Sequence, residues 1–147
     1  MAFERDLATV PSISLRVGNE LDDYRQPTAF NPDLDTTTDD YLDKYHWGIA
    51  HLDAASWRYY VPHLVSYSIR HFSESSNTID SFLGSLRPPD REPSRLGSLT
   101  PDQENAIKEF LEFLAFSDGS EHQELACQTI EEWWIPGALY RPGGPPA

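Results

Sequence analysis

Cysteine is almost absent from this sequence, and its scarcity excludes one class of protein. The 147 residues include a single cysteine, Cys127, so no disulfide can form within the chain. Small secreted domains held together by disulfides are therefore excluded, and a reducing compartment is favoured. The first residues lack the apolar stretch of a signal peptide, and no apolar run approaches the ~20 residues of a membrane span. We expect a cytoplasmic protein that does not associate with membranes.

Basic residues are also scarce. The chain has 11 Lys and Arg residues against 24 Asp and Glu residues, a net charge of −13. This excludes nucleic-acid binding through a basic face, because phosphate contacts need clustered cations. Residues 1–53 hold 11 acidic and four basic residues and residues 100–147 hold nine and two, so each end carries −7. Such a surface can serve solubility alone, or it can steer association with a basic partner.

The common signatures of catalysis, cofactor binding and metal binding are absent. There is no glycine-rich phosphate loop, no dinucleotide fingerprint and no Gly-x-Ser-x-Gly turn. No two of the five histidines are four residues apart, which is the helical metal-ligand spacing. The acidic segment 33–43 opens like a calcium loop, but Thr38 and Lys44 occupy the positions that need Gly and Glu. We therefore expect no catalytic residue, no cofactor and no bound metal.

Helix signals dominate the rest of the chain. Thr100, Pro101 and Gln103 form a complete helix start, with an N-cap, a proline at the first position and a capping-box partner. An aromatic helix is expected after Asp53, and Pro62 within it should kink the helix or restart it. Asn77 or Thr78 is expected to cap the following helix. We expect a mainly α fold, a compact bundle of four to six helices around an aromatic core.

The expected domain organisation is simple. Residues 1–140 form a single helical domain with long loops at 25–38 and 87–98, and residues 141–147 form a flexible tail. Residues 12–17 alternate like a short strand but fit a helical face equally well. The 87–98 loop concentrates three of the eleven basic residues, Arg87, Arg91 and Arg95, and the sequence gives them no role.

Three segments resemble a family of small bacterial proteins of unknown function. They are Trp-Arg-Tyr-Tyr-Val-Pro-His-Leu at 57–64, the leucine-rich helix at 82–86, and the helix at 99–114 that begins Leu-Thr-Pro-Asp-Gln and ends Phe-Leu-Glu-Phe-Leu. The likeness covers residues 41–115, with a weaker similarity at 7–24. His63 stands where the family often has a small residue. The resemblance implies a helical fold and a bacterial cytosolic origin, and it brings no known activity or site residues.

These observations favour an acidic protein-binding module. The most concrete form is an immunity or inhibitor protein that neutralises a basic partner such as a bacterial toxin. The expected contact residues are Asp33, Asp35, Asp39, Asp40, Asp43, Glu131, Glu132 and Trp134. One alternative is a small enzyme with an unfamiliar site around His63, His71, Tyr59 and Tyr67. Another is a homo-oligomeric structural subunit that associates through Trp133 and Trp134, and the sequence leaves the oligomeric state open.

Overall fold

Helices provide the regular structure of the chain, which confirms the mainly α prediction. The computed structural model describes residues 2–22, 28–91 and 94–141, and these ranges contain no strand. The elements are α1 (Glu4–Leu7), α2 (Leu15–Asp22), α3 (Asp39–Lys44), the 3-10 helix η1 (His46–His51), α4 (Ala54–Arg70), α5 (Asn77–Ser85), the 3-10 helix η2 (Leu96–Ser98), α6 (Pro101–Phe116), α7 (Gln123–Thr129) and the π-helix η3 (Ile130–Trp134). None of the helices in the described ranges is both long enough and apolar enough to cross a bilayer.

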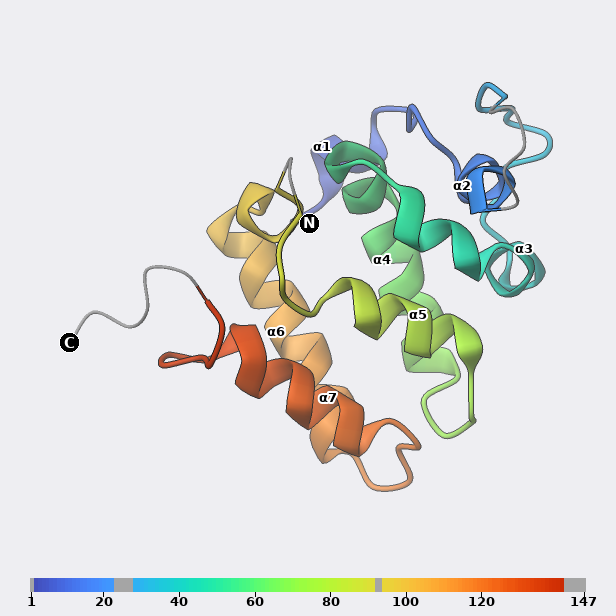
Figure 1. Ribbon diagram of the computed structural model, residues 1–147. Coiled ribbons are helices and arrows are strands. Elements are labelled where there is room, and N and C mark those ends of the chain that lie inside the picture. Colours follow the sequence, from blue (N-terminus) through green and yellow to red (C-terminus); the bar gives the residue numbers. More distant parts are fainter. Residues whose placement is uncertain (1, 23–27, 92–93, 142–147) are drawn as a thin grey trace.

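The helices form two groups joined by a central pair. Figure 1 shows α6 and α7 side by side in one group and α2, α3 and η1 in the other, with α4 and α5 between them. Trp57 and Tyr60 of α4 and Phe82 of α5 are fully buried and make up the aromatic centre of the core. Phe82 also meets Phe110 of α6, with ring centroids 5.5 Å apart. The central pair therefore connects both groups through aromatic contacts.

The start signals read from the sequence hold for two helices and fail for one. The capping box of α6 is present, since the Thr100 hydroxyl accepts from the Gln103 N–H and the Gln103 side chain accepts from the Thr100 N–H. Asp53 caps α4, which continues as one helix through Pro62. The cap of α5 is Ser76, whose hydroxyl accepts from the Ile79 N–H at 3.1 Å. The prediction of Asn77 or Thr78 was wrong because the helix already begins at Asn77.

The ambiguous segment at 12–17 enters a helix. α2 begins at Leu15, and it packs so tightly on η1 that a Cβ on Gly18 would lie 2.5 Å from the Gly48 carbonyl oxygen. The predicted 25–38 loop is free of helix over its described part, 28–38. The 87–98 segment is a loop that closes with η2. Residues 23–27, 92–93 and 142–147, the last of which made up most of the predicted tail, lie outside the described residues.

Candidate acidic interface

The acidic segment 33–43 does not act as one surface, because its second acid is buried. Asp35 is 3% exposed. Arg16 of α2 donates to both of its carboxylate oxygens at 3.1 Å, and the Tyr41 hydroxyl donates to it at 2.8 Å. Burial would raise the pKa of Asp35, but the bonds from Arg16, from the Asn31 N–H and from Tyr41 outweigh it and lower that pKa. Asp35 was wrongly predicted as a partner contact, since it is a structural residue that fixes α2 against the 28–38 loop.

The next acids lie on α3 and face the end of α4. The Nε2 atom of His71 lies 2.8 Å from an Asp39 carboxylate oxygen, and its Nδ1 atom lies 3.1 Å from a Glu74 oxygen. Because ionised carboxylates only accept hydrogen bonds, both ring nitrogens must carry protons. The Asp39 bond is the main cause that raises the pKa of His71, and the same bond lowers the pKa of Asp39, helped by Arg70. His71 therefore links two carboxylates from separate elements.

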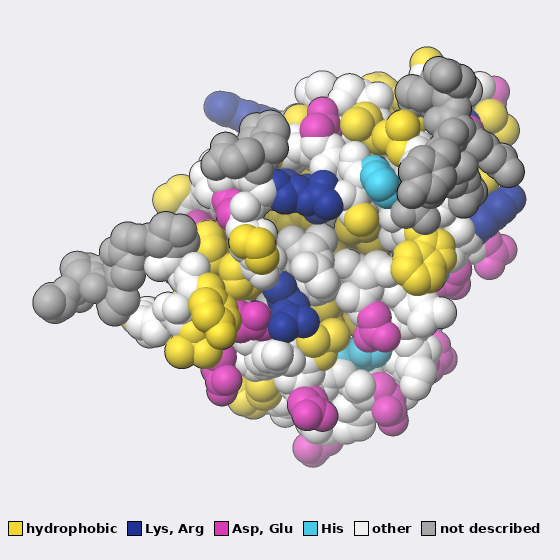
Figure 2. All heavy atoms as spheres, viewed as in Figure 1, with side chains coloured by type: hydrophobic (Ala, Val, Ile, Leu, Met, Phe, Trp, Pro, Cys, Tyr) yellow, Lys and Arg dark blue, Asp and Glu magenta, His cyan; other side chains and the backbone are white. Residues whose placement is uncertain are grey.

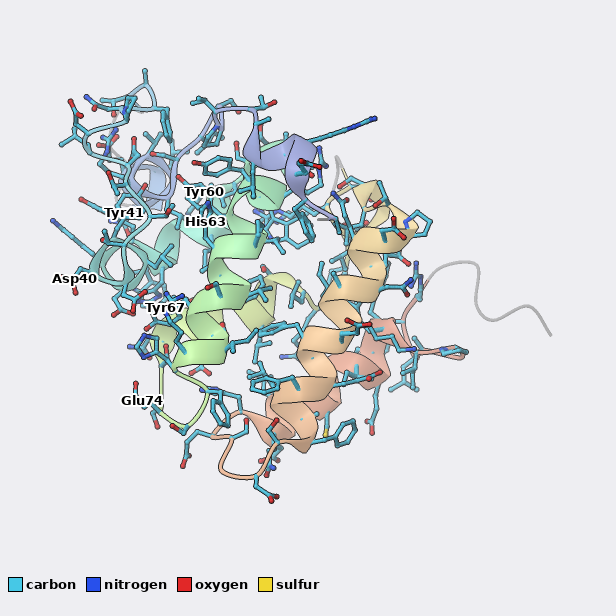
Figure 3. The ribbon with its side chains drawn as sticks, turned by 180° about the vertical axis from the view of Figure 1, so that it is seen from behind. Asp40, Tyr41, Tyr60, His63, Tyr67 and Glu74 are labelled. Carbon is cyan, nitrogen blue, oxygen red and sulfur yellow. The ribbon has the colours of Figure 1, made fainter. Side chains whose placement is uncertain are left out.

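Asp43 lies one turn further along α3 and borders a polar cavity. One of its oxygens accepts from the hydroxyls of Tyr67 and Thr78, the second at 2.7 Å. The other oxygen has no hydrogen bond from any described residue. Asp43, Tyr67, His71, Glu74 and the 75–78 segment line a cavity of about 340 Å³. Figure 3 shows Asp40, Tyr67 and Glu74 along one side of the molecule, where α3 meets the end of α4.

Two loops extend this acidic region toward α7. The Glu121 N–H donates to the Phe72 carbonyl at 2.9 Å, and a ring nitrogen of His122 lies 2.7 Å from the Glu74 carbonyl oxygen. The other ring nitrogen of His122 lies 3.8 Å from the Asp80 carboxylate, which is 60% exposed. We call this region the acidic edge, and its acids are Asp39, Asp40, Asp43, Glu74, Asp80 and Glu121. The edge combines three predicted acids with three that the sequence analysis did not select.

Intramolecular pairing removes most of the positive charge that could offset this edge. Among the described residues, the arginines that form ion pairs with carboxylates are Arg16, Arg58, Arg70, Arg87 and Arg141. Most of these arginines pair with one carboxylate each. Because the chain holds 13 more acidic than basic residues, many carboxylates remain without an arginine or lysine partner. Asp40 and Glu121 are exposed, and no described residue forms an ion pair with either. Figure 2 shows acidic side chains gathered along the lower part of one face.

The acids predicted near the C-terminus lie elsewhere, and two of the three predicted contacts there are buried. Figure 1 shows η3 on the side of the molecule opposite α3. Glu132 is 8% exposed and accepts two hydrogen bonds from Arg87, at 2.8 and 3.3 Å. Trp134 is 4% exposed, and its indole N–H donates to the Leu86 carbonyl at 2.9 Å. Glu132 and Trp134 were therefore wrongly predicted as partner contacts. Asp33 and Glu131 are exposed, but neither belongs to the acidic edge.

The residues expected for the alternative functions, a small enzyme and a homo-oligomeric subunit, do not form a common site or an exposed contact either. His63 packs against Tyr59, with ring centroids 5.4 Å apart, and its Nδ1 atom lies 3.3 Å from the Thr37 hydroxyl. Burial lowers the pKa of His63. His71 instead lines the polar cavity with Tyr67, so the two histidines do not share a site. Trp133 is 5% exposed, and it cannot provide the proposed dimer contact with Trp134 without rearrangement.

The described residues contain no group of three or more His, Cys, Asp or Glu side chains placed to hold a metal ion. Cys127 is a free, half-buried thiol. The acidic edge is a cluster of carboxylates of which all but Asp39 are exposed, and such a cluster attracts cationic groups.

Comparison with models of known protein families shows to which family the chain belongs. The family of unknown function DUF6714 matches residues 1–138. The chain belongs to this family. The match to DUF6714 includes the whole acidic edge and extends beyond the 41–115 range of the sequence resemblance. Searches of curated proteins and of solved structures found no match. Membership of DUF6714 agrees with the expected family of unknown function and assigns no activity.

Proposed function

We propose that this protein is an acidic protein-binding module of the immunity or inhibitor type, which neutralises a basic protein through its acidic edge. One observation carries the proposal: most described arginines are paired within the chain, while every edge acid except Asp39, which pairs with Arg70 and His71, is exposed and keeps a carboxylate oxygen without a hydrogen bond from a described residue. A surface of this kind attracts a cationic partner over a distance of about 10 Å at moderate salt.

The polar cavity gives the edge a specific place for a cationic side chain. Asp43 and Glu74 line it from opposite elements, and each keeps one oxygen without a hydrogen bond from a described residue. A lysine or arginine side chain of the partner that enters this cavity meets carboxylates on its lining, and charge-assisted hydrogen bonds to them are stronger than neutral ones. The Tyr67 hydroxyl already holds Asp43 in place, so little side-chain ordering is needed on binding.

The experiment is capture of the partner from cells in which the protein is native. Three forms serve as bait: the wild type, an edge variant (Asp40→Asn, Asp80→Asn, Glu121→Gln) and a control variant (Glu4→Gln, Asp102→Asn, Glu109→Gln). Both variants remove three exposed carboxylates that make no ion pair with a described arginine or lysine, so their net charge is the same.

The proposal expects one dominant basic protein to be retained by the wild type and the control at low salt. The edge variant should lose it, and high salt should release it. A dominant partner that is acidic, or one that the edge and control variants retain equally, contradicts the proposal.

A further inference from the structure

The basic residues that the acidic interface does not use gather at a second cavity on the molecule. This cavity, of about 380 Å³, lies between η1, α5 and the 87–98 segment, and its lining includes His46, Trp47, Ser81, Arg87, Arg91 and Arg95. Figure 2 shows Lys and Arg side chains in the middle of the face on which the acids gather below. Three arginines at one cavity are unusual in a chain with only 11 basic residues and a net charge of −13.

Arg95 is buried at this cavity without a carboxylate partner among the described residues. The residue is 4% exposed. Its Nε atom donates to the Leu52 carbonyl at 3.1 Å, and its Nη2 atom donates to the Ile49 carbonyl at 2.8 Å. These carbonyls end η1 and satisfy two of the guanidinium nitrogens, but they do not neutralise the charge. The Nη1 atom has no acceptor among the described residues, and it is not sealed from solvent.

Arg91 adds a second positive charge beside the first. It is exposed, and its guanidinium forms no hydrogen bond or ion pair with a described residue. Burial lowers the pKa of Arg95 to about 10, and repulsion from Arg91 contributes to the same shift, while attraction to Asp53 and Asp90 only partly opposes it. Arg87 differs from both because Glu132 already neutralises it. Two like charges held together, one of them buried, leave a site that an anion stabilises.

One carboxylate connects the described parts of the segment that carries Arg91 and Arg95. Asp90 accepts from the backbone N–H groups of Arg91, Arg95, Leu96 and Gly97, at 2.8 to 2.9 Å. Asp90 also lines the cavity and attracts Arg95, but its carboxylate forms no hydrogen bond with either guanidinium. The backbone bonds to Asp90 hold Arg91 and Arg95 near each other before a ligand arrives, which lowers the entropic cost of binding.

Trp47 supplies an apolar surface at the same cavity. Its side chain is 61% exposed, whereas Trp57, Trp133 and Trp134 are buried. A flat, exposed indole at the same cavity as two arginines without a carboxylate partner suits a ligand with a planar ring and an anionic group. We propose that this cavity binds a small aromatic oxyanion, with its phosphate or carboxylate group on Arg91 and Arg95 and its ring against Trp47.

The test is a titration at low salt with phenyl phosphate, benzoate and inorganic phosphate, monitored by calorimetry and by tryptophan fluorescence, with Trp47→Ala showing which part of the fluorescence change comes from Trp47. Phenyl phosphate or benzoate should bind saturably, and the tighter of the two identifies the anionic group. Arg91→Ala should weaken that binding by about tenfold or more, because a hydrogen bond to a charged group is lost. Trp47→Ala should weaken the aromatic ligand but not inorganic phosphate. Arg5→Ala removes an exposed charge elsewhere and should change the affinity by less than about twofold.

Arg91 is the residue of choice for this test because its exposed guanidinium makes no contact that the fold requires. Arg95 substitutions would also uncap η1 and could unfold the protein. Absence of binding by the wild type up to about 10 mM of each probe overturns the proposal. Equal weakening by Arg91→Ala and Arg5→Ala also overturns it, as does tighter binding of inorganic phosphate than of both aromatic probes.

Discussion

Asp35 is the acid whose role differs most from its appearance in the sequence. Its side chain is fully buried and accepts from Arg16, Tyr41 and the Asn31 backbone. Removal of one partner from a buried ion pair leaves the other charge uncompensated, which costs about 3–5 kcal/mol. Because Arg16 keeps its ion pair with Glu20 at 3.1 Å, Asp35→Ala should lower the free energy of unfolding by the lower end of that range, about 3 kcal/mol, in urea titrations. Asp33→Ala, at an exposed position in the same segment, should change it by less than about 0.5 kcal/mol.

The same carboxylate should contribute to acid unfolding. The folded-state pKa of Asp35 lies below its ordinary value of 3.8, so its contribution to stability is complete above that value. The contribution is lost as the pH falls through the folded-state pKa. A wild type and an Asp35→Ala variant that lose stability in parallel below pH 4 would contradict this assignment.

His71 should show the opposite pH dependence. Its folded-state pKa lies above 6.5, so the stability it provides is complete below pH 6.5 and is lost as the pH rises through the folded value. The site is partly exposed, which limits the contribution to about 1 kcal/mol or less. An NMR titration of the imidazole should give a midpoint above 6.5 in the wild type and a lower midpoint in Asp39→Asn. His63 should titrate below 6.5 in both proteins. An unchanged His71 midpoint in Asp39→Asn would show that the pair does not form.

At the scale of the elements, the start of α5 shows which side chain accepts hydrogen bonds from the first backbone N–H groups of a helix. Ser76 accepts from the Ile79 N–H, and replacement of such a cap by alanine costs about 1 kcal/mol. Ser76→Ala should therefore lower the free energy of unfolding by about that amount in denaturant titrations. Asn77 is exposed within the helix, so Asn77→Ala should change it by less than about 0.5 kcal/mol. A larger loss of free energy of unfolding for Asn77→Ala than for Ser76→Ala would contradict Ser76 as the cap and favour Asn77 instead.

Local signals in the sequence predict some elements well and others poorly. The start of α6 is predictable because Thr100, Pro101 and Gln103 combine three independent signals in four positions. The cap of α5 is less so, because Ser76, Asn77 and Thr78 are all good capping residues and only the tertiary packing decides among them. The close approach of Gly18 to Gly48 also depends on long-range packing, so the choice of helix for residues 15–22 had no decisive local signal.

At the scale of the whole molecule, the candidate site was only partly predictable. Asp39, Asp40 and Asp43 could be selected because all three belong to the acidic segment 33–43. Glu74 and Asp80 could not be joined to them, because the link runs through His71 and His122 across separate loops. The ion pair of Arg87 with Glu132, 45 residues later, likewise cannot be predicted from the spacing of residues along the sequence.

The charge distribution explains how one small chain can carry two different surfaces. Carboxylates outside the acidic edge pair with Arg58, Arg87 and Arg141, and within the edge Arg70 pairs with Asp39 alone, so the remaining acids of the edge keep it negative. The exposed guanidinium of Arg91 and the buried guanidinium of Arg95 line the second cavity, and neither forms an ion pair with a described residue. We therefore propose that the two regions attract ligands of opposite charge, although His46 lines both cavities.

The most direct test of the acidic interface is the salt dependence of affinity for the captured basic partner. The dissociation constant should be measured at about 50 and 300 mM salt for the wild type, the edge variant and the control variant. The account predicts that the wild type and control lose affinity steeply with salt, while the edge variant binds weakly and depends little on salt. Equal affinities and equal salt dependence for the edge and control variants would contradict it.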